Sequence, residues 1–199
     1  MSNADRGRPA TRATLADFLA IPEDERFHEL INGELERKSS PAAEHGRAQR
    51  KLGAAVDPFD QPPGGRPPGG WWVMTEVEIS LVGHIFRPDV VGWRRDRVPA
   101  CPTGTPVEVR PDWICEVLSP ASAGRDRVKK LNHYCAAGVP HDWLLDPAEE
   151  TLAIDRHTPD GYLLALAAGS GQRVRAEPFD AIELDVAELF GREDAPVPG

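Results

Sequence analysis

Two acidic residues, Asp89 and Glu116, have the chemistry to hold a divalent metal ion together. Asp89 follows Pro88, and a proline inside a strand marks an edge or bulge where the next side chain can be re-aimed. Glu116 is the only charge in the apolar run 113–118, which predicts a strand covered on both faces. If the two strands are neighbours, roughly 5 Å apart, the carboxylates can meet. Two such oxygen ligands suit Mg²⁺ or Mn²⁺ better than zinc.

A structural ion pair is the second interpretation of Glu116. A carboxylate buried in a strand costs several kcal/mol unless a cation or hydrogen-bond donors face it. Arg125 and Arg127 follow closely enough in the sequence to supply that cation. Asp112 cannot share an ion with Glu116, because four residues of strand separate them by roughly 13 Å. The residues alone therefore leave a structural pair and half of a metal site both open.

The base that would complete a metal site is missing from the strand of Glu116. Leu118 points to the same face as Glu116, two residues on, where a lysine would face the site. In the helix expected next, Asp126, Lys130 and Tyr134 recur at intervals of four residues and share one face. We therefore expect Lys130 to reach towards Glu116, with Tyr134 more a core residue than a catalytic one.

The elements that position these residues alternate between helices and strands. Asn32-Gly33 predicts a type I′ hairpin within residues 27–38. Ser39-Ser40-Pro41 predicts the start of a helix, and Gly138 followed by Pro140 predicts the end of another. Helices are expected at 14–20, 42–56 and 125–137, with a helical turn at 186–190. Strands are expected at 71–81, 85–93, 113–118, 141–145, 151–157, 162–167 and 174–184. This order predicts one α/β domain over residues 14–190, with flexible segments at 1–13 and 191–199.

Composition excludes several classes of protein. The formal net charge of −9 argues against indiscriminate binding to nucleic acid, although it leaves room for a local basic groove. No run of 18 apolar residues is present, which argues against a membrane span. The three cysteines form no C-x-x-C pair, so we expect reduced thiols in a cytoplasmic protein. No G-x-S-x-G motif supports a serine hydrolase.

A resemblance to a known family rests on several motifs in one order. Pro88-Asp89, Glu116-Val117-Leu118-Ser119-Pro120 and the spacing of Asp126, Lys130 and Tyr134 belong to it. Further motifs are 29–34 (ELINGE), 40–46 (SPAAEHG), 137–140 (AGVP) and 143–147 (WLLDP). Over roughly residues 14–190 the chain resembles the "putative restriction endonuclease" family of the PD-(D/E)xK nuclease superfamily.

The resemblance implies a restriction-endonuclease-like core, a mixed β-sheet flanked by helices, here with an added hairpin and meander. It also implies metal-dependent phosphodiester cleavage, with nucleic acid, DNA above all, as the partner and a homodimer as one possible assembly. Asp89 and Glu116 carry over as metal ligands and catalytic residues, Lys130 as the catalytic lysine, and Glu44 as an auxiliary ligand through water. Leu118 departs from the superfamily pattern, which has a lysine there.

Each candidate also has a purely structural interpretation. Asp89 could cap a turn, and Glu116 with Lys130 could form a buried pair without turnover. Glu44 and His45 are more often surface or packing residues on such a helix. The basic residues Arg125, Arg127 and Lys129 are candidates for nucleic-acid contacts or simply a solvated face. Two functions follow: a Mg²⁺- or Mn²⁺-dependent endonuclease, or an inert nucleic-acid-binding or regulatory module in which Lys130 fills the cation pocket.

Overall fold

The structure is a computed structural model of the 199-residue chain, and it describes residues 12–38, 40–64, 68–119 and 125–192. Most of the expected arm at 1–13 and tail at 191–199 lies outside these ranges, as do the side chains of Arg125 and Arg127. Among the described residues, no helix combines the length and apolar character needed to cross a membrane.

A six-stranded mixed sheet forms the centre of the fold. Its strand order is β10-β9-β8-β7-β6-β3, in which β7 and β8 are parallel and every other neighbouring pair is antiparallel. The strands are β3 (Trp71–Thr75), β6 (Val90–Arg94), β7 (Trp113–Val117), β8 (His141–Asp146), β9 (Thr151–Thr158) and β10 (Gly161–Gly169). The parallel pair requires a crossover connection, which α3 (Arg125–Ala136) supplies. Gly138, with φ +70°, lies just past the end of α3 as predicted.

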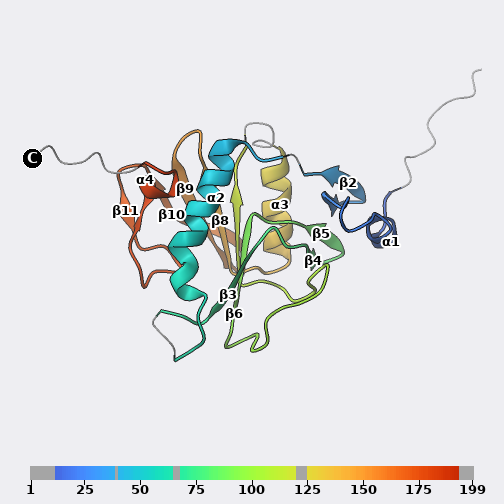
Figure 1. Cartoon of the computed structure of the whole chain (residues 1–199), viewed down its shortest axis with the longest axis horizontal. Helices are drawn as coiled ribbons and strands as arrows, with labels where there is room; N and C mark the ends of the chain where they lie inside the picture. The colour runs from blue at the N-terminus through green and yellow to red at the C-terminus, as the bar shows by residue number, and fades with distance from the viewer. Residues whose placement is uncertain (1–11, 39, 65–67, 120–124, 193–199) are drawn as a thin grey trace, which may run out of the picture.

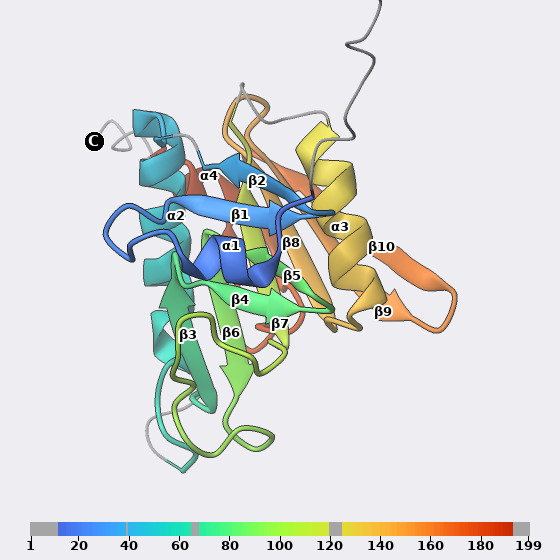
Figure 2. The same ribbon diagram turned by 90° about the vertical axis from the view of Figure 1, so that its right-hand side faces the viewer.

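A smaller antiparallel sheet, β2-β1-β5-β4, lies in front of the large one (Figure 2). Its strands are β1 (His28–Ile31), β2 (Glu34–Arg37), β4 (Ile79–Leu81) and β5 (His84–Phe86). Asn32 and Gly33 join β1 to β2 with φ values of +54° and +79°, which confirms the predicted type I′ turn. The short helix α1 (Leu15–Leu19) packs on this sheet through Phe18.

Two hydrophobic cores cover the two faces of the large sheet. On one face, buried side chains of α2 (Ala43–Val56) and α4 (Val186–Leu189) pack against Trp113 and Trp143. The 3₁₀ turn η1 (Asp57–Phe59) and the strand pair β11 (Arg173–Val174) and β12 (Leu184–Asp185) complete that side. On the other face, α3 and the small sheet pack against Val91 and Ile114. Figure 1 shows α2 and α3 separated by the strands of the large sheet. The expected α/β core with a mixed sheet and flanking helices is present.

Four local predictions were wrong. Residues 85–93 do not form one strand, because β5 ends at Phe86 in the small sheet and β6 begins at Val90 in the large sheet, on the two sides of Pro88. Residues 71–81 form two strands in different sheets, β3 and β4, because Glu76 adopts a φ of +57° and turns the chain out of the large sheet. Residues 174–184 form a loop between two-residue strands instead of one strand. The cap of α2 is Ala42, which makes no side-chain capping bond, so Ser40 and Pro41 precede the helix without starting it.

Candidate active site

Asp89 and Glu116 lie opposite each other at one end of neighbouring strands. Val90 of β6 pairs with Cys115 of β7, so the next residue along each antiparallel strand brings Asp89 beside Glu116. The backbone N–H of Val117 donates to Asp89 Oδ2 at 2.7 Å. This confirms the expected adjacency of the two strands. Asp112 lies at the other end of β7 and forms an ion pair with Arg97, in agreement with its exclusion from the site.

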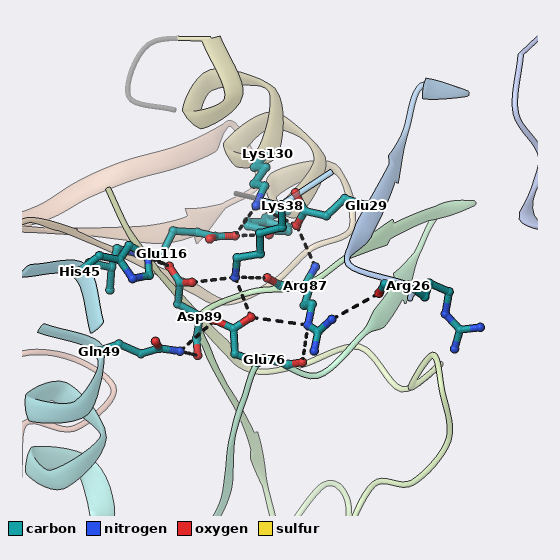
Figure 3. Close-up of polar contacts among 12 residues, drawn as sticks. Arg26, Glu29, Lys38, His45, Gln49, Glu76, Arg87, Asp89, Glu116 and Lys130 are labelled. Atoms are coloured by element: carbon teal, nitrogen blue, oxygen red, sulfur yellow. Dashed lines mark hydrogen bonds and ion pairs between the residues drawn. The ribbon is translucent and has the colours of Figure 1, made fainter. Parts of the chain in front are cut away.

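The two carboxylates line a cavity of about 900 Å³. Its walls come from both sheets and from the helices on both faces of the large sheet. Figure 3 shows His45 and Gln49 projecting from α2 towards Asp89, and Lys130 projecting from α3 towards Glu116. Side chains that are far apart in the sequence therefore meet in one polar pocket, of the size that protein ligand sites commonly have.

Asp89 is almost fully buried but surrounded by donors. Lys38 Nζ lies 2.7 Å from its Oδ1, and His45 Nε2 lies 3.2 Å from its Oδ2. Burial alone would raise the pKa of Asp89, but the hydrogen bond from His45 and the charge of Lys38 hold that pKa well below its ordinary value. Asp89 is therefore ionised, and His45 Nε2 carries the proton of their hydrogen bond. His45 Nδ1 is buried and has no hydrogen-bond partner among the described residues.

Glu116 is held by α3. Tyr134 donates its hydroxyl to Glu116 Oε1 at 2.7 Å, and Lys130 Nζ lies 3.2 Å from the same oxygen. Burial raises the pKa of Glu116, and the charges of Asp89 and Glu29 add to this rise, while Lys130 opposes it. Lys130 also pairs with Glu29 Oε1 of β1 at 2.8 Å. Burial alone would lower the pKa of Lys130, but the charges of Glu116 and Glu29 raise it above its ordinary value. Lys130 is therefore a cation between two carboxylates.

Glu76 and Gln49 complete the surroundings of Lys38. Lys38 Nζ donates to Glu76 Oε2 at 2.9 Å and to the carbonyl oxygen of Arg87 at 2.8 Å, in addition to Asp89. Gln49 Nε2 donates to Glu76 Oε1 at 3.1 Å and to the carbonyl of Asp89 at 2.9 Å. Burial would lower the pKa of Lys38, but the charges of Asp89, Glu116 and Glu76 raise it. Lys38 is thus a second cation of the pocket.

Glu44 was expected in this cleft, and that placement is wrong. Its side chain is exposed and lines a separate, smaller depression with Arg47 and Glu150. In the first turns of α2 the buried face carries His45, whose side chain is 7% exposed, and Ala48. Successive side chains of an α-helix point about 100° apart around its axis. The orientation of α2 that directs His45 into the cleft therefore directs Glu44 away from it.

The basic run on α3 is described only in part. Lys129 Nζ lies 3.1 Å from Glu36 Oε1 on β2, so this side chain points away from Glu116, as expected. The side chains of Arg125 and Arg127 lie outside the described residues, and their expected contacts with nucleic acid stay predictions.

The residues present fit a divalent cation. Mg²⁺ is commonly held by one or two carboxylates, with water and substrate phosphate completing its shell. Asp89 and Glu116 supply two carboxylates from neighbouring strands, and the ammonium groups beside them show that this end of the sheet attracts cations. Among the described residues, no group of three or more His, Cys, Asp or Glu side chains is arranged to hold a metal. The carboxylate oxygens of Asp89 and Glu116 are typical ligands of a hard ion such as Mg²⁺, whereas zinc sites in proteins are built mostly from Cys and His.

Carboxylates outnumber Lys and Arg in the cavity wall, as far as the structure describes it. The acids are Glu29, Glu36, Glu76, Asp89, Glu116, Asp142 and Asp155, and the bases are Arg37, Lys38, Arg87 and Lys130. A polyanion entering such a pocket meets net repulsion unless additional cations accompany it. The charge balance therefore favours a bound divalent cation if the substrate is a phosphate ester.

Sequence reasoning missed five members of this network, among them Gln49 on α2. Three of them lie just past the ends of strands: Lys38 follows β2, Glu76 follows β3 and Arg87 follows β5. Their signal in the sequence is weak, because a strand pattern places charges on a solvated face by default. Glu29 had a clearer signal, since it precedes the buried pair Leu30-Ile31 within a short strand.

The fold and site define a restriction-endonuclease-like α/β protein with an acidic cleft at the end of a mixed sheet. The model of the Uma2 family, described as "Putative restriction endonuclease", matches residues 15–187, so the chain belongs to this family. A crystal structure from Anabaena variabilis, described as a putative nuclease belonging to DUF820, is similar with a TM-score of 0.73 and 24% identity. The match covers 89% of this chain and 97% of that one, and at this identity it shows the fold. No curated protein shows significant similarity to the chain.

Proposed function

We propose that the protein is a divalent-metal-dependent endonuclease that hydrolyses phosphodiester bonds of DNA. The observation that carries the proposal is the meeting of Asp89 and Glu116 on neighbouring strands at the wall of one cavity, with Lys130 on Glu116. The family description supports nucleic acid as the substrate. The acidic cavity wall supports a metal requirement, because repulsion of the phosphate backbone must be offset.

Asp89 and Glu116 would hold Mg²⁺ or Mn²⁺, and Lys130 would serve the reaction from α3. When bound, such an ion supplies Lewis-acid polarisation of the phosphate and lowers the pKa of a water molecule. The low pKa of Asp89 keeps this ligand ionised. The raised pKa of Lys130 keeps its ammonium charged. This cation would orient the attacking water or offset the negative charge that builds on the phosphate. The water oxygen bonds to phosphorus and releases a proton to solvent, while the bond from phosphorus to the leaving oxygen breaks and that oxygen takes a proton from solvent. Lys130 on α3 thus takes the role of the catalytic lysine, which Leu118 cannot fill because its side chain is apolar.

One observation favours the inert module as a second candidate. Both site carboxylates already have lysine partners, Lys38 at 2.7 Å from Asp89 and Lys130 at 3.2 Å from Glu116. Such pairs would persist in a relic that binds nucleic acid without cutting it.

Nicking of supercoiled plasmid separates the two candidates. Wild-type protein with saturating Mn²⁺ or Mg²⁺ should convert supercoiled DNA into open circles, and a chelator should stop the reaction. Asp89→Ala should be inactive while it remains folded by circular dichroism. A wild type that leaves DNA and RNA intact at all metal concentrations, yet retards them in gels, would decide for the binding module.

A further inference from the structure

The ammonium of Lys38 is enclosed by three oxygens. Asp89 Oδ1 lies at 2.7 Å, the carbonyl oxygen of Arg87 at 2.8 Å and Glu76 Oε2 at 2.9 Å (Figure 3). A lysine ammonium has three N–H donors, so these three contacts satisfy it completely. The side chain is 20% exposed and Asp89 is 2% exposed. This is a built cation pocket whose present occupant belongs to the chain itself.

We propose that this pocket, formed by Asp89, Glu76 and the carbonyl of Arg87, is where the divalent cation binds at Asp89. In this view Lys38 is a tethered competitor that must leave when the ion binds. The inference rests on the proposed metal-dependent function and deepens it, because it makes Glu76 a metal-binding residue and Lys38 a regulator of metal affinity. Neither role was expected from the sequence.

The donor set matches a hard divalent ion. Two carboxylate oxygens and one backbone carbonyl oxygen are typical ligands of Mg²⁺ and Mn²⁺. Gln49 donates to the other carboxylate oxygen of Glu76, and the N–H of Val117 and His45 Nε2 contact the other carboxylate oxygen of Asp89, so both acids are oriented before any ion arrives. An ammonium and a divalent ion cannot share the same three oxygens, since like charges at contact distance repel. Binding of the ion therefore requires that the Lys38 side chain move.

Lys38 is well suited to move alone. Its backbone N–H donates to the carbonyl of Phe27 at 2.8 Å, which fixes the main chain next to the end of β2. Four flexible methylene groups separate this fixed backbone from the ammonium. The same cavity contains Glu36, a carboxylate that is not among the proposed metal ligands. A displaced ammonium thus stays within an acidic wall, or meets the phosphate of a bound substrate.

With this competition, the apparent metal affinity equals the intrinsic affinity multiplied by the fraction of protein molecules in which Lys38 is out of the pocket. Replacement of Lys38 by methionine keeps the length of the side chain and removes the competing charge. Lys38→Met should therefore bind Mn²⁺ about tenfold more tightly than wild type. The matched control is Lys129→Met, which changes the net charge equally but removes a lysine that pairs with Glu36 and makes no contact with the three oxygens around Lys38.

Titration calorimetry with Mn²⁺ alone measures this effect on the three proteins without any activity assay. A gain of about tenfold or more for Lys38→Met, with Lys129→Met within about twofold of wild type, supports the competition. Equal affinities of Lys38→Met and wild type, or weaker binding by Lys38→Met, overturn it. Plasmid nicking by wild type in saturating Mn²⁺ is run in parallel. If wild type nicks DNA and the affinities are equal, this inference fails and the proposed function stands; if no variant binds Mn²⁺, both fail.

Amine labelling of the wild-type protein tests the same displacement even if Lys38→Met does not fold. An acylating reagent is applied with and without saturating Mg²⁺, and modification of each lysine is quantified by mass spectrometry. Labelling of Lys38 should rise several-fold with Mg²⁺ because its ammonium leaves the pocket, while labelling of Lys129 stays constant. Unchanged or reduced labelling of Lys38 in a protein saturated with Mg²⁺ contradicts the displacement.

Discussion

Replacement of Lys130 by methionine removes the cation that separates two buried carboxylates. Its ammonium lies 2.8 Å from Glu29 and 3.2 Å from Glu116, and the side chains of the three residues are 13%, 7% and 14% exposed. Loss of one partner of a buried ion pair costs about 3–5 kcal/mol, because the remaining charge is uncompensated. Glu116 keeps the hydroxyl of Tyr134 and Glu29 keeps the N–H of Arg87, so we expect the lower end, about 3 kcal/mol.

The loss should depend on pH in a defined direction. Burial raises the pKa of Glu116 above its ordinary value of 4.5, and Lys130 is the largest influence that lowers it. Without Lys130 the pKa in the folded state rises further, whereas that in the unfolded state does not change. The folded variant therefore holds a proton that the unfolded chain releases. Its loss of stability should be small below about pH 4.5 and grow as the pH rises through the raised pKa.

Thermal unfolding in the presence of a chelator measures both effects. For a chain of this size, about 3 kcal/mol corresponds to a fall in Tm of about 6–12 °C at pH 8. Lys129→Met is the control on the same helix, and its half-exposed pair with Glu36 should be worth less than about 1 kcal/mol. A Tm for Lys130→Met within about 2 °C of wild type at pH 8 would refute the reasoning. If the protein is a nuclease, the variant should also nick DNA more slowly, with Mn²⁺ affinity unchanged or slightly higher because a neighbouring positive charge has gone.

Asp89→Asn should reduce plasmid nicking to the level seen with chelator and weaken Mn²⁺ binding in calorimetry; nicking at more than a tenth of the wild-type rate would argue against Asp89 as a ligand. Glu44→Gln should leave Mn²⁺ affinity within about twofold of wild type, because this exposed side chain lies outside the cavity, and a tenfold loss would restore it to the site. Tyr134→Phe removes the 2.7 Å donor to Glu116 and should cost about 1–3 kcal/mol in urea unfolding, with no loss expected only if water replaces the hydroxyl.

The sequence predicted the strand pair that carries the site because its signals there are local and strong. Glu116 stands alone in an apolar run, and Pro88 marks an irregularity just before Asp89, so each carboxylate could be assigned to its own strand. The position of Lys130 followed from helical spacing, which the structure reproduces with Lys130 and Tyr134 both on Glu116. These inferences needed only the direction of side chains within one element.

The rest depended on how elements meet. Residues 71–81 alternate like one strand, but a single left-handed residue, Glu76, moves the chain to a second sheet, and alternation does not report such a break. Glu44 and His45 are neighbours in the sequence, and which of them faces the cleft depends on how α2 rotates to bury Ala48 and Leu52. Lys38 reaches Asp89 because two sheets pack together, a contact between residues 51 positions apart. Such contacts leave no periodic signal in a single sequence.

The two lysines balance the charge of the two carboxylates proposed as metal ligands. Lys38 from the small sheet neutralises Asp89, and Lys130 from α3 neutralises Glu116, so each carboxylate has its own cation from a different element. They differ in what surrounds them. Lys130 lies between the carboxylates of Glu29 and Glu116, and its removal leaves these two buried charges to repel each other, which lowers the stability of the fold. Asp89 keeps His45 and the N–H of Val117 when Lys38 leaves, so its charge remains compensated. Under the proposed competition, Lys130 is thus the fixed cation that supports the fold, and Lys38 is the exchangeable one whose place a divalent ion takes.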